Sequence, residues 1–199
     1  WDMMLWSSGG KTNDFSENLY KAAALDRMME SCAENEIYIS FTIFNHCQFR
    51  SKGTDNSWGS MPFKLGKKYG YLESPAEFWT NEQAKKDAKC LIRYLVARYG
   101  YSRNILTWEL GNEITSCEGE YTDIRQWCAE MTEYIRSIDS TGHMISVSSA
   151  KYDDPIIFDK IFDFINIHWY AYNSIEQYTS KLASYSVMYN KPVLASEMG

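Results

Sequence analysis

Hydrophobic positions along the chain follow two different spacings. In some segments apolar residues recur every three or four positions, which is the period of a helix with one buried face. Between these segments lie short, nearly continuous runs of β-branched and aromatic residues, which are typical of strands buried on both faces. The first spacing predicts helices over residues 17–34, 80–100, 122–142 and from 174 onward, with a short helix or turn at 155–161. The apolar runs predict strands over 37–44, 105–110, 144–149, 162–168 and 192–196.

Polar and small residues mark several helix boundaries. Residues 80–83 and 174–177 each form a capping box, in which a hydroxyl side chain and a Glu or Gln side chain close a helix N-terminus. Thr122 is the expected cap of the third helix, which should end near Gly142. The first helix is expected to bury a stripe made of Leu19, Ala22, Leu25, Met29 and Cys32.

The order of elements predicts the fold class. Helices and strands alternate with short connections, as they do in a parallel sheet with right-handed crossovers. Open doubly wound sheets and closed barrels both fit this order. No glycine-rich phosphate-binding motif follows any of the strands, which removes the commonest signature of the open nucleotide-binding sheets and favours an α/β barrel.

One connection is unusually long. Residues 46–79 are rich in glycine, proline and polar side chains, and a loop of this length in a compact domain is usually functional or mobile. Trp58 and Trp79 lie in or beside it. They are equally consistent with outer sugar subsites and with anchors of the loop, because tryptophan buries a large area wherever it lies.

Composition and charge limit the classes of molecule that this chain is expected to bind. The 199 residues are 45% hydrophobic, enough for one domain or most of one, and carry a net charge of −6. This charge argues against nucleic acid and anionic membranes as partners, and no apolar stretch is long enough to span a bilayer. Five cysteines without a CxxC pair favour buried thiols, and a Cys117–Cys128 disulfide stays open as an alternative. The 16% of aromatic residues tilts the expectation mildly toward a surface that stacks on sugar rings.

Polar residues with catalytic chemistry follow the predicted strands. In a parallel barrel the active site lies at the carboxyl ends of the strands. His46, Asn112 with Glu113, the run from His168 to Tyr170, and Glu197 all stand at such ends. Two carboxylates in one barrel mouth supply the proton donor and the anion that glycoside hydrolysis requires.

Two of these segments resemble a known group of enzymes. Residues 106–113 (LTWELGNE) and 192–199 (PVLASEMG) resemble the fourth-strand and seventh-strand signatures of the clan of retaining glycosidases that contains the family 5 cellulases and mannanases, and residues 97–105 resemble the usual lead-in to the first signature. The resemblance implies a (β/α)8 TIM barrel of which this chain, residues 1–199, is a partial catalytic domain. Its strands would be numbers three to seven, with residues 1–6 the tail of strand two and strands one and eight not in the chain.

The resemblance also implies roles for individual residues. Glu113 would be the acid/base and Glu197 the nucleophile, with their carboxyl groups about 5 to 5.5 Å apart as in retaining enzymes. Asn112 would bind the sugar 2-hydroxyl and Tyr170 would orient the nucleophile. His46 and His168 match the histidines of strands three and six, and they are as consistent with structural roles as with substrate binding.

Several expectations follow for the protein as a whole. The substrate would be a carbohydrate, with β-1,4-glucan or mannan preferred by analogy, and the chemistry requires no metal and no organic cofactor. We expect a monomer. The resemblance implies an extracellular or periplasmic location. Trp169 and Tyr170, which end one strand, are further candidates for sugar contacts.

Two other kinds of barrel protein fit parts of this sequence. Three histidines are consistent with a metal-dependent barrel hydrolase as a second class of enzyme. However, the chain has neither a His-x-His near its first strands nor an HExxH motif. A non-catalytic carbohydrate-binding barrel stays open as the alternative. Glu109 lies about 13 Å deeper along its strand than Glu113, where a structural role is expected and a Lys or Arg partner would be needed to keep it charged. His143, before a strand, is expected to have no part in the site.

Overall fold

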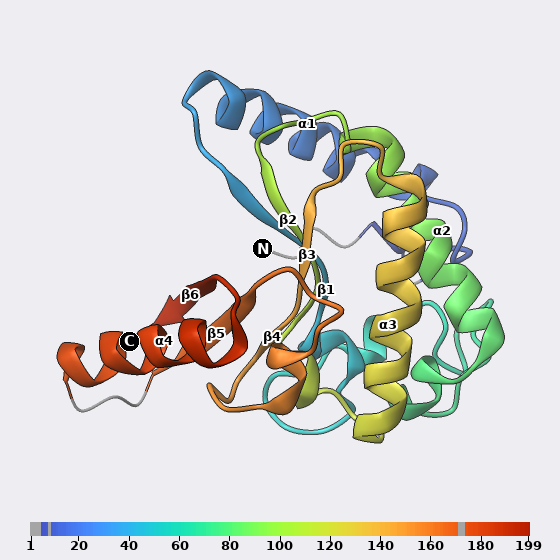
Figure 1. The fold of residues 1–199 in the computed structure, drawn as a ribbon. Coiled ribbons are helices and arrows are strands. Elements are labelled where there is room, and N and C mark those ends of the chain that lie inside the picture. Colours follow the sequence, from blue (N-terminus) through green and yellow to red (C-terminus); the bar gives the residue numbers. More distant parts are fainter. Residues whose placement is uncertain (1–4, 8, 171–173) are drawn as a thin grey trace.

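Parallel strands form the centre of the structure, which is a computed structural model describing residues 5–7, 9–170 and 174–199. Among these residues, two three-stranded parallel sheets follow one another in chain order (Figure 1). The first sheet has the order β1 (Ile39–Asn45), β2 (Ile105–Asn112) and β3 (Met144–Ser146). The second has the order β4 (Ser148–Ser149), β5 (Ile165–Trp169) and β6 (Val193–Met198).

The predicted strand at 144–149 serves both sheets. Its first half pairs with β2 and its second half pairs with β5, and only Val147 separates the two halves. The polypeptide therefore turns from one sheet into the next within a single extended segment. This curvature brings the carboxyl ends of β2 and β6 toward each other.

Helices cover the outer side of the strands. The helices α1 to α3 pack along β1 to β3, and α4 packs on β6 (Figure 1). Their bounds are Leu19–Glu34 for α1, Glu82–Tyr99 for α2, Tyr121–Ile138 for α3 and Ile175–Tyr189 for α4. Single 3-10 turns occupy Ser16–Asn18, His46–Phe49, Trp58–Ser60, Pro75–Trp79, Ile114–Ser116 and Pro155–Phe158.

Several predicted boundaries and faces are wrong in detail. Leu19 is half exposed, because it is the first residue of α1, whereas the rest of the predicted stripe is buried. The strand predicted at 37–44 begins at Ile39 and is buried on one face only, since Ser40 and Thr42 are exposed. Helix α3 begins after Glu120 instead of being capped by Thr122, and it ends at Ile138.

The long loop is held by aromatic packing. Phe49, Phe63 and Phe78 contact one another and the two loop tryptophans. Trp58 and Trp79 are buried, and the Trp79 indole donates a hydrogen bond of 2.8 Å to the Glu118 carbonyl. Both tryptophans are therefore anchors of the loop, and neither is available as an outer subsite.

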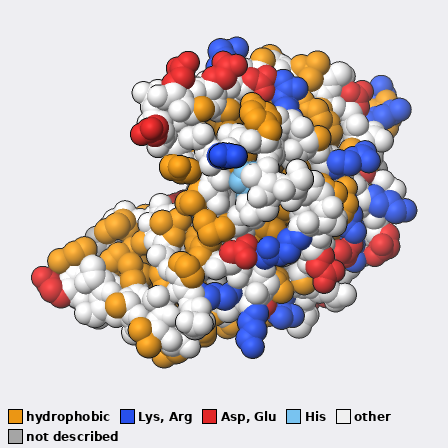
Figure 2. Space-filling view, turned by 45° about the horizontal axis from the view of Figure 1, so that its top comes forward, with side chains coloured by type: hydrophobic (Ala, Val, Ile, Leu, Met, Phe, Trp, Pro, Cys, Tyr) orange, Lys and Arg blue, Asp and Glu red, His pale blue; other side chains and the backbone are white. Residues whose placement is uncertain are grey.

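Charged side chains are scattered over the face shown in Figure 2, and hydrophobic side chains gather over the part that carries α4. The exposed large hydrophobic residues of α4 and β6 include Ile175, Val187, Met188 and Met198, each about half exposed or more. None of the helices in the described part of the chain has the length and apolarity to cross a membrane. All five cysteines are free thiols, three of them buried.

Candidate active site

The carboxyl ends of four strands bring the predicted polar residues together. His46 follows β1, Asn112 ends β2, His168 lies in β5 and Glu197 lies in β6. Glu113 comes directly after β2. The parallel pairing places these residues at one edge of the sheets, because each strand enters the edge in the same direction.

The turn after β2 sets the position of Glu113. A Cβ atom on Gly111 would lie 2.5 Å from the Ile114 Cδ1 atom, so only glycine lets Ile114 fold back under the strand. Glu113 then takes a left-handed conformation with φ of 48°, and its N–H donates to the Ser148 Oγ at 3.0 Å. A non-glycine residue in this region costs roughly 1 to 2 kcal/mol.

His168 connects the two carboxylates. Its Nδ1 atom lies 3.1 Å from Glu113 Oε1 and 3.4 Å from Glu197 Oε2. An oxygen of Glu113 and an oxygen of Glu197 lie within 4.8 Å of each other. The His168 ring is 1% exposed, whereas the Glu113 and Glu197 side chains are 18% and 40% exposed, so both acids are open to a ligand.

Asn112 and His46 complete one side of the site. The Asn112 Nδ2 atom donates to Glu197 Oε1 at 3.2 Å, and its Oδ1 atom lies 3.2 Å from the His46 Nδ1 atom. Because an amide oxygen only accepts, His46 donates from Nδ1. The same nitrogen is 3.7 Å from Glu113 Oε2, so His46 contacts both members of the Asn-Glu pair.

Tyr170 lies on the other side of Glu197. Its hydroxyl donates a hydrogen bond to Glu197 Oε2. This hydrogen bond, together with the negative charges of Glu197 and Glu113, raises the pKa of Tyr170 to about 12, because a phenolate would face two carboxylates. Tyr170 is half exposed, and it stays a protonated donor at neutral pH.

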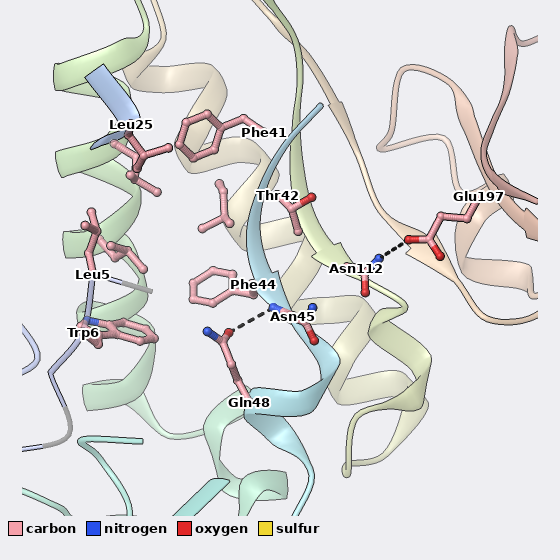
Figure 3. A pocket seen from close by; sticks show the side chains of 13 residues that line it. Leu5, Trp6, Leu25, Phe41, Thr42, Phe44, Asn45, Gln48, Asn112 and Glu197 are labelled. Carbon is pink, nitrogen blue, oxygen red and sulfur yellow. Dashed lines mark hydrogen bonds between the residues drawn. The ribbon is translucent and has the colours of Figure 1, made fainter. Parts of the chain in front are cut away.

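A cavity of about 300 Å³ opens beside this cluster. Figure 3 shows Thr42 and Asn112 on the side that faces Glu197, with Phe41 and Phe44 on the other side of β1, toward Leu25 and Trp6. The cavity is therefore polar at the site and apolar behind the first strand.

Comparison with known proteins agrees with this geometry. Residues 3–199 match the family model described as Cellulase (glycosyl hydrolase family 5). The chain belongs to glycosyl hydrolase family 5. As a family 5 chain it has the α/β architecture of TIM-barrel glycoside hydrolases, with parallel strands at its centre.

Individual relatives of this family 5 chain are mannanases. It is 29% identical to mannan endo-1,4-beta-mannosidase A of Podospora anserina over 78% of the chain and 38% of that protein. It is 40% identical to mannan endo-1,4-beta-mannosidase F of Aspergillus clavatus over 38% of the chain and 17% of that protein. The chain thus spans well under half the length of these curated relatives.

The fold also matches solved structures. An endo-1,4-beta-D-mannanase from Thermotoga petrophila superposes with a TM-score of 0.64 at 18% identity, covering 88% of this chain and 58% of that one. A beta-glucuronidase of an uncultured Clostridium gives 0.58 at 20% identity, covering 87% of this chain and 28% of that one. At these identities the likeness shows the fold alone.

One predicted sugar contact is wrong in this family 5 site. Trp169 is 6% exposed and packs against Tyr152 and Tyr178, with ring centroids 4.3 and 5.2 Å away. The cause is the alternation of a strand, which sends the side chains of His168 and Tyr170 to one face and that of Trp169 to the other.

Glu109 is deep in the structure, as predicted, but its partners are different. It is 5% exposed, and its donors among the described residues are hydroxyls and an amide in place of the expected Lys or Arg. They are the Thr42 Oγ1 atom at 2.6 Å, the Ser40 Oγ atom at 3.3 Å and the Asn166 Nδ2 atom at 3.4 Å.

Sequence reasoning missed three residues that hold the site. Ser148 accepts the Glu113 N–H, and Asn166 with Ser196 forms a hydrogen bond of 2.6 Å beneath Glu197. The sequence contains a signal for Asn166. It is a polar residue in an apolar strand, two positions before His168, so its side chain must lie on the same face as that of His168. Ser148 had none, because its role depends on the turn that carries Glu113.

The cluster also offers donor atoms of the kinds that bind divalent metals. Glu113, His168 and Glu197 supply one such atom each, within 4.8 Å of one another. Two carboxylates that share one imidazole serve equally as the charged pair of an acid–base site. The exposed side of both carboxylates leaves room for a substrate between them.

Proposed function

We propose that this protein hydrolyses β-1,4 linkages of a mannan with retention of configuration, with Glu113 as acid/base and Glu197 as nucleophile. The observation that carries the proposal is the distance of less than 4.8 Å between carboxylate oxygens of the two residues. Retaining enzymes hold these groups about 5 to 5.5 Å apart, whereas inverting enzymes leave about 6.5 to 9.5 Å for a water. Mannan is preferred over glucan because the curated relatives reported above are mannosidases.

Each step uses a group that the site already presents. Glu113 protonates the glycosidic oxygen as the bond to the anomeric carbon breaks, and a Glu197 oxygen forms the new bond to that carbon. Glu113 then takes a proton from water, whose oxygen displaces Glu197. Asn112 and Tyr170 donate to the two oxygens of Glu197 and so fix its direction of attack.

The complete barrel, the oligomeric state and the location of the protein belong to the same proposal. The six strands described here, with β3 and β4 as the two halves of one strand, would be strands three to seven of an eight-stranded barrel, and the chain covers 58% of the Thermotoga mannanase chain. β1 lies at the edge of its sheet, where a further strand of the barrel would pair with it. We also propose a monomer that acts outside the cytoplasm, where a polymeric substrate would be met.

Azide rescue distinguishes the two proposed roles. With a dinitrophenyl β-mannobioside, Glu113→Ala should keep the first step, because the leaving group needs no proton, and added azide should give the β-glycosyl azide. Glu197→Ala should give the α-glycosyl azide by direct displacement. On mannan itself Glu113→Ala should lose roughly 10² to 10⁴ in kcat.

Glu120→Ala is the matched control, since Glu120 is an exposed carboxylate whose side chain does not cap α3. It should keep wild-type turnover. Equal turnover in all three variants, or an α product from Glu113→Ala, would show that these carboxylates do not have the roles assigned to them. Oligosaccharide binding without turnover in the wild type would favour a carbohydrate-binding barrel.

A further inference from the structure

The pairing of β5 with β6 breaks at one residue. Asn166 pairs with Leu194 and Ile167 with Ala195, but His168 pairs with Glu197, so Ser196 has no partner in the ladder. An extra residue in one strand is a β-bulge, which bends the strand and redirects the side chains that follow it. The bulge here falls immediately before the proposed nucleophile.

The bulge explains a contact pattern that a regular strand could not make. Asn166 and His168 are two residues apart on β5, so their side chains share a face. Their partners from β6 are Ser196 and Glu197, which are consecutive. In an unbroken strand consecutive side chains point to opposite faces. Only with Ser196 as the extra residue do both side chains reach the face that carries the site.

A chain of hydrogen bonds leads from this bulge to the floor of the structure. The Ser196 hydroxyl donates to Asn166 Oδ1 at 2.6 Å, and Asn166 Nδ2 donates to Glu109 Oε1 at 3.4 Å. Glu109 Oε2 in turn accepts from Thr42 and Ser40 of β1. The chain therefore joins β6, β5, β2 and β1 across the inner face.

The acceptor oxygens of Glu109 give the hydrogen-bond chain its direction. Glu109 Oε1 accepts from the Asn166 Nδ2 atom, so the Asn166 amide turns its nitrogen toward Glu109 and its oxygen toward β6. That Asn166 oxygen requires a donor. The hydroxyl of Ser196, the residue without a partner in the strand ladder, supplies it. Asn166 is fully buried and Glu109 nearly so, which makes an unsatisfied alternative costly.

We propose that Glu109, Asn166 and Ser196 form a positioning chain that holds the β6 bulge and thereby aims Glu197 at the substrate, a proposal that rests on the nucleophile role proposed above. None of the three touches the reacting atoms. Their effect passes through the backbone at Ser196 to the next residue. This gives the buried glutamate of β2 a function that is distinct from that of Glu113.

Ser196→Ala tests the chain at its last link, and Ser196→Thr restores the hydroxyl. Ser146→Ala is the matched control, because it also removes a buried hydroxyl that is hydrogen bonded across strands, to Thr107 at 3.2 Å, but on β3. Asn166→Ala removes the middle link. Thermal denaturation of each variant establishes that it is folded before the other measurements.

The first readout is the pKa of Tyr170, which is measured by NMR titration of ¹³C-tyrosine-labelled protein. The Tyr170→Phe variant identifies the resonance of Tyr170. The hydrogen bond to Glu197 raises this pKa to about 12, so a displaced Glu197 should let it fall toward 10 in Ser196→Ala and Asn166→Ala. Ser146→Ala and Ser196→Thr should keep the wild-type value. An unchanged Tyr170 pKa in both Ser196→Ala and Asn166→Ala would overturn the proposal, whether or not the protein is active.

The second readout is turnover of the dinitrophenyl β-mannobioside. Ser196→Ala should lower kcat by about tenfold, the effect of one neutral hydrogen bond, with KM unchanged. Ser146→Ala should keep kcat even if it loses the same thermal stability, and equal losses of kcat in both would contradict a positioning role. A shifted Tyr170 pKa in a protein without turnover would leave the chain standing and remove the proposed function instead.

Discussion

At the scale of single residues, alternation along the strands decides which side chains reach the site. His168 and Tyr170 reach it because they are two residues apart, and Trp169 between them packs against Tyr178 of α4. Sequence alone could have excluded Trp169, since a strand with His168 inward must turn Trp169 outward. It could not have predicted the left-handed backbone of Glu113, which depends on packing between Gly111 and Ile114.

His143 illustrates a buried histidine whose partner is structural. The ring lies 2.9 Å from Asp139 Oδ2 through Nδ1 and 2.9 Å from the Ser102 carbonyl through Nε2. Burial alone would raise the pKa of Asp139, but hydrogen bonds from His143 and Trp108 outweigh burial and hold that pKa below its usual 3.8. The sequence analysis predicted that His143 lies outside the site, because it precedes a strand. It did not identify Asp139 as the partner.

The lowered pKa of Asp139 predicts an acid-dependent loss of stability. Since the folded protein favours the carboxylate, its stabilising effect is complete above pH 3.8 and is lost as the pH falls through the lower folded pKa. Asp139→Asn should cost about 1 to 3 kcal/mol at pH 7 because it weakens several buried hydrogen bonds. Urea denaturation from pH 7 to pH 3 should show the two proteins converging at the acid end.

Asp153→Asn, at an exposed aspartate, is the control for that measurement. It should follow the wild type over the whole range. A constant difference between wild type and Asp139→Asn down to pH 3 would mean that the charge of Asp139 has no part in stability.

At the scale of elements, the apolar spacing predicted the type of each main helix and strand but not the ends. Helix α2 begins at Glu82, as the capping box suggested to within two residues. The side chain that caps it is Asn81, which accepts from the N–H groups of Gln83 and Ala84 at 2.9 and 3.1 Å. The predicted cap, Thr80, is therefore wrong by one residue, because the helix begins only after the Pro75–Trp79 turn and its C-cap Thr80.

The cap can be assigned by a pair of alanine variants. Asn81→Ala should lower the free energy of unfolding by about 1 kcal/mol, since two N–H groups lose their acceptor. Thr80→Ala, one residue earlier, should change it by no more than about 0.5 kcal/mol. Denaturant titration of both variants makes the comparison, and the reverse order of the two effects would assign the cap to Thr80.

At the scale of the whole molecule, the order of elements predicted a parallel α/β architecture, and the two strand-end motifs predicted the family. Both are confirmed by the parallel sheets and by the family 5 match over residues 3–199. The division of residues 144–149 between two sheets was beyond the sequence, because curvature depends on contacts between strands far apart in the chain. The bulge at Ser196 was beyond it for the same reason, although the bulge sets the direction of Glu197.

The central claim is that Glu197 forms a covalent bond to the sugar while Glu113 moves the proton. Incubation with 2-deoxy-2-fluoro-β-mannosyl fluoride, followed by mass spectrometry of the intact protein and of its peptides, tests it most directly. Double displacement predicts one added fluoro-sugar, located on Glu197, in the wild type, and none in Glu197→Gln. A label on another residue, or rapid turnover of this reagent through an inverted product without any label, would contradict it.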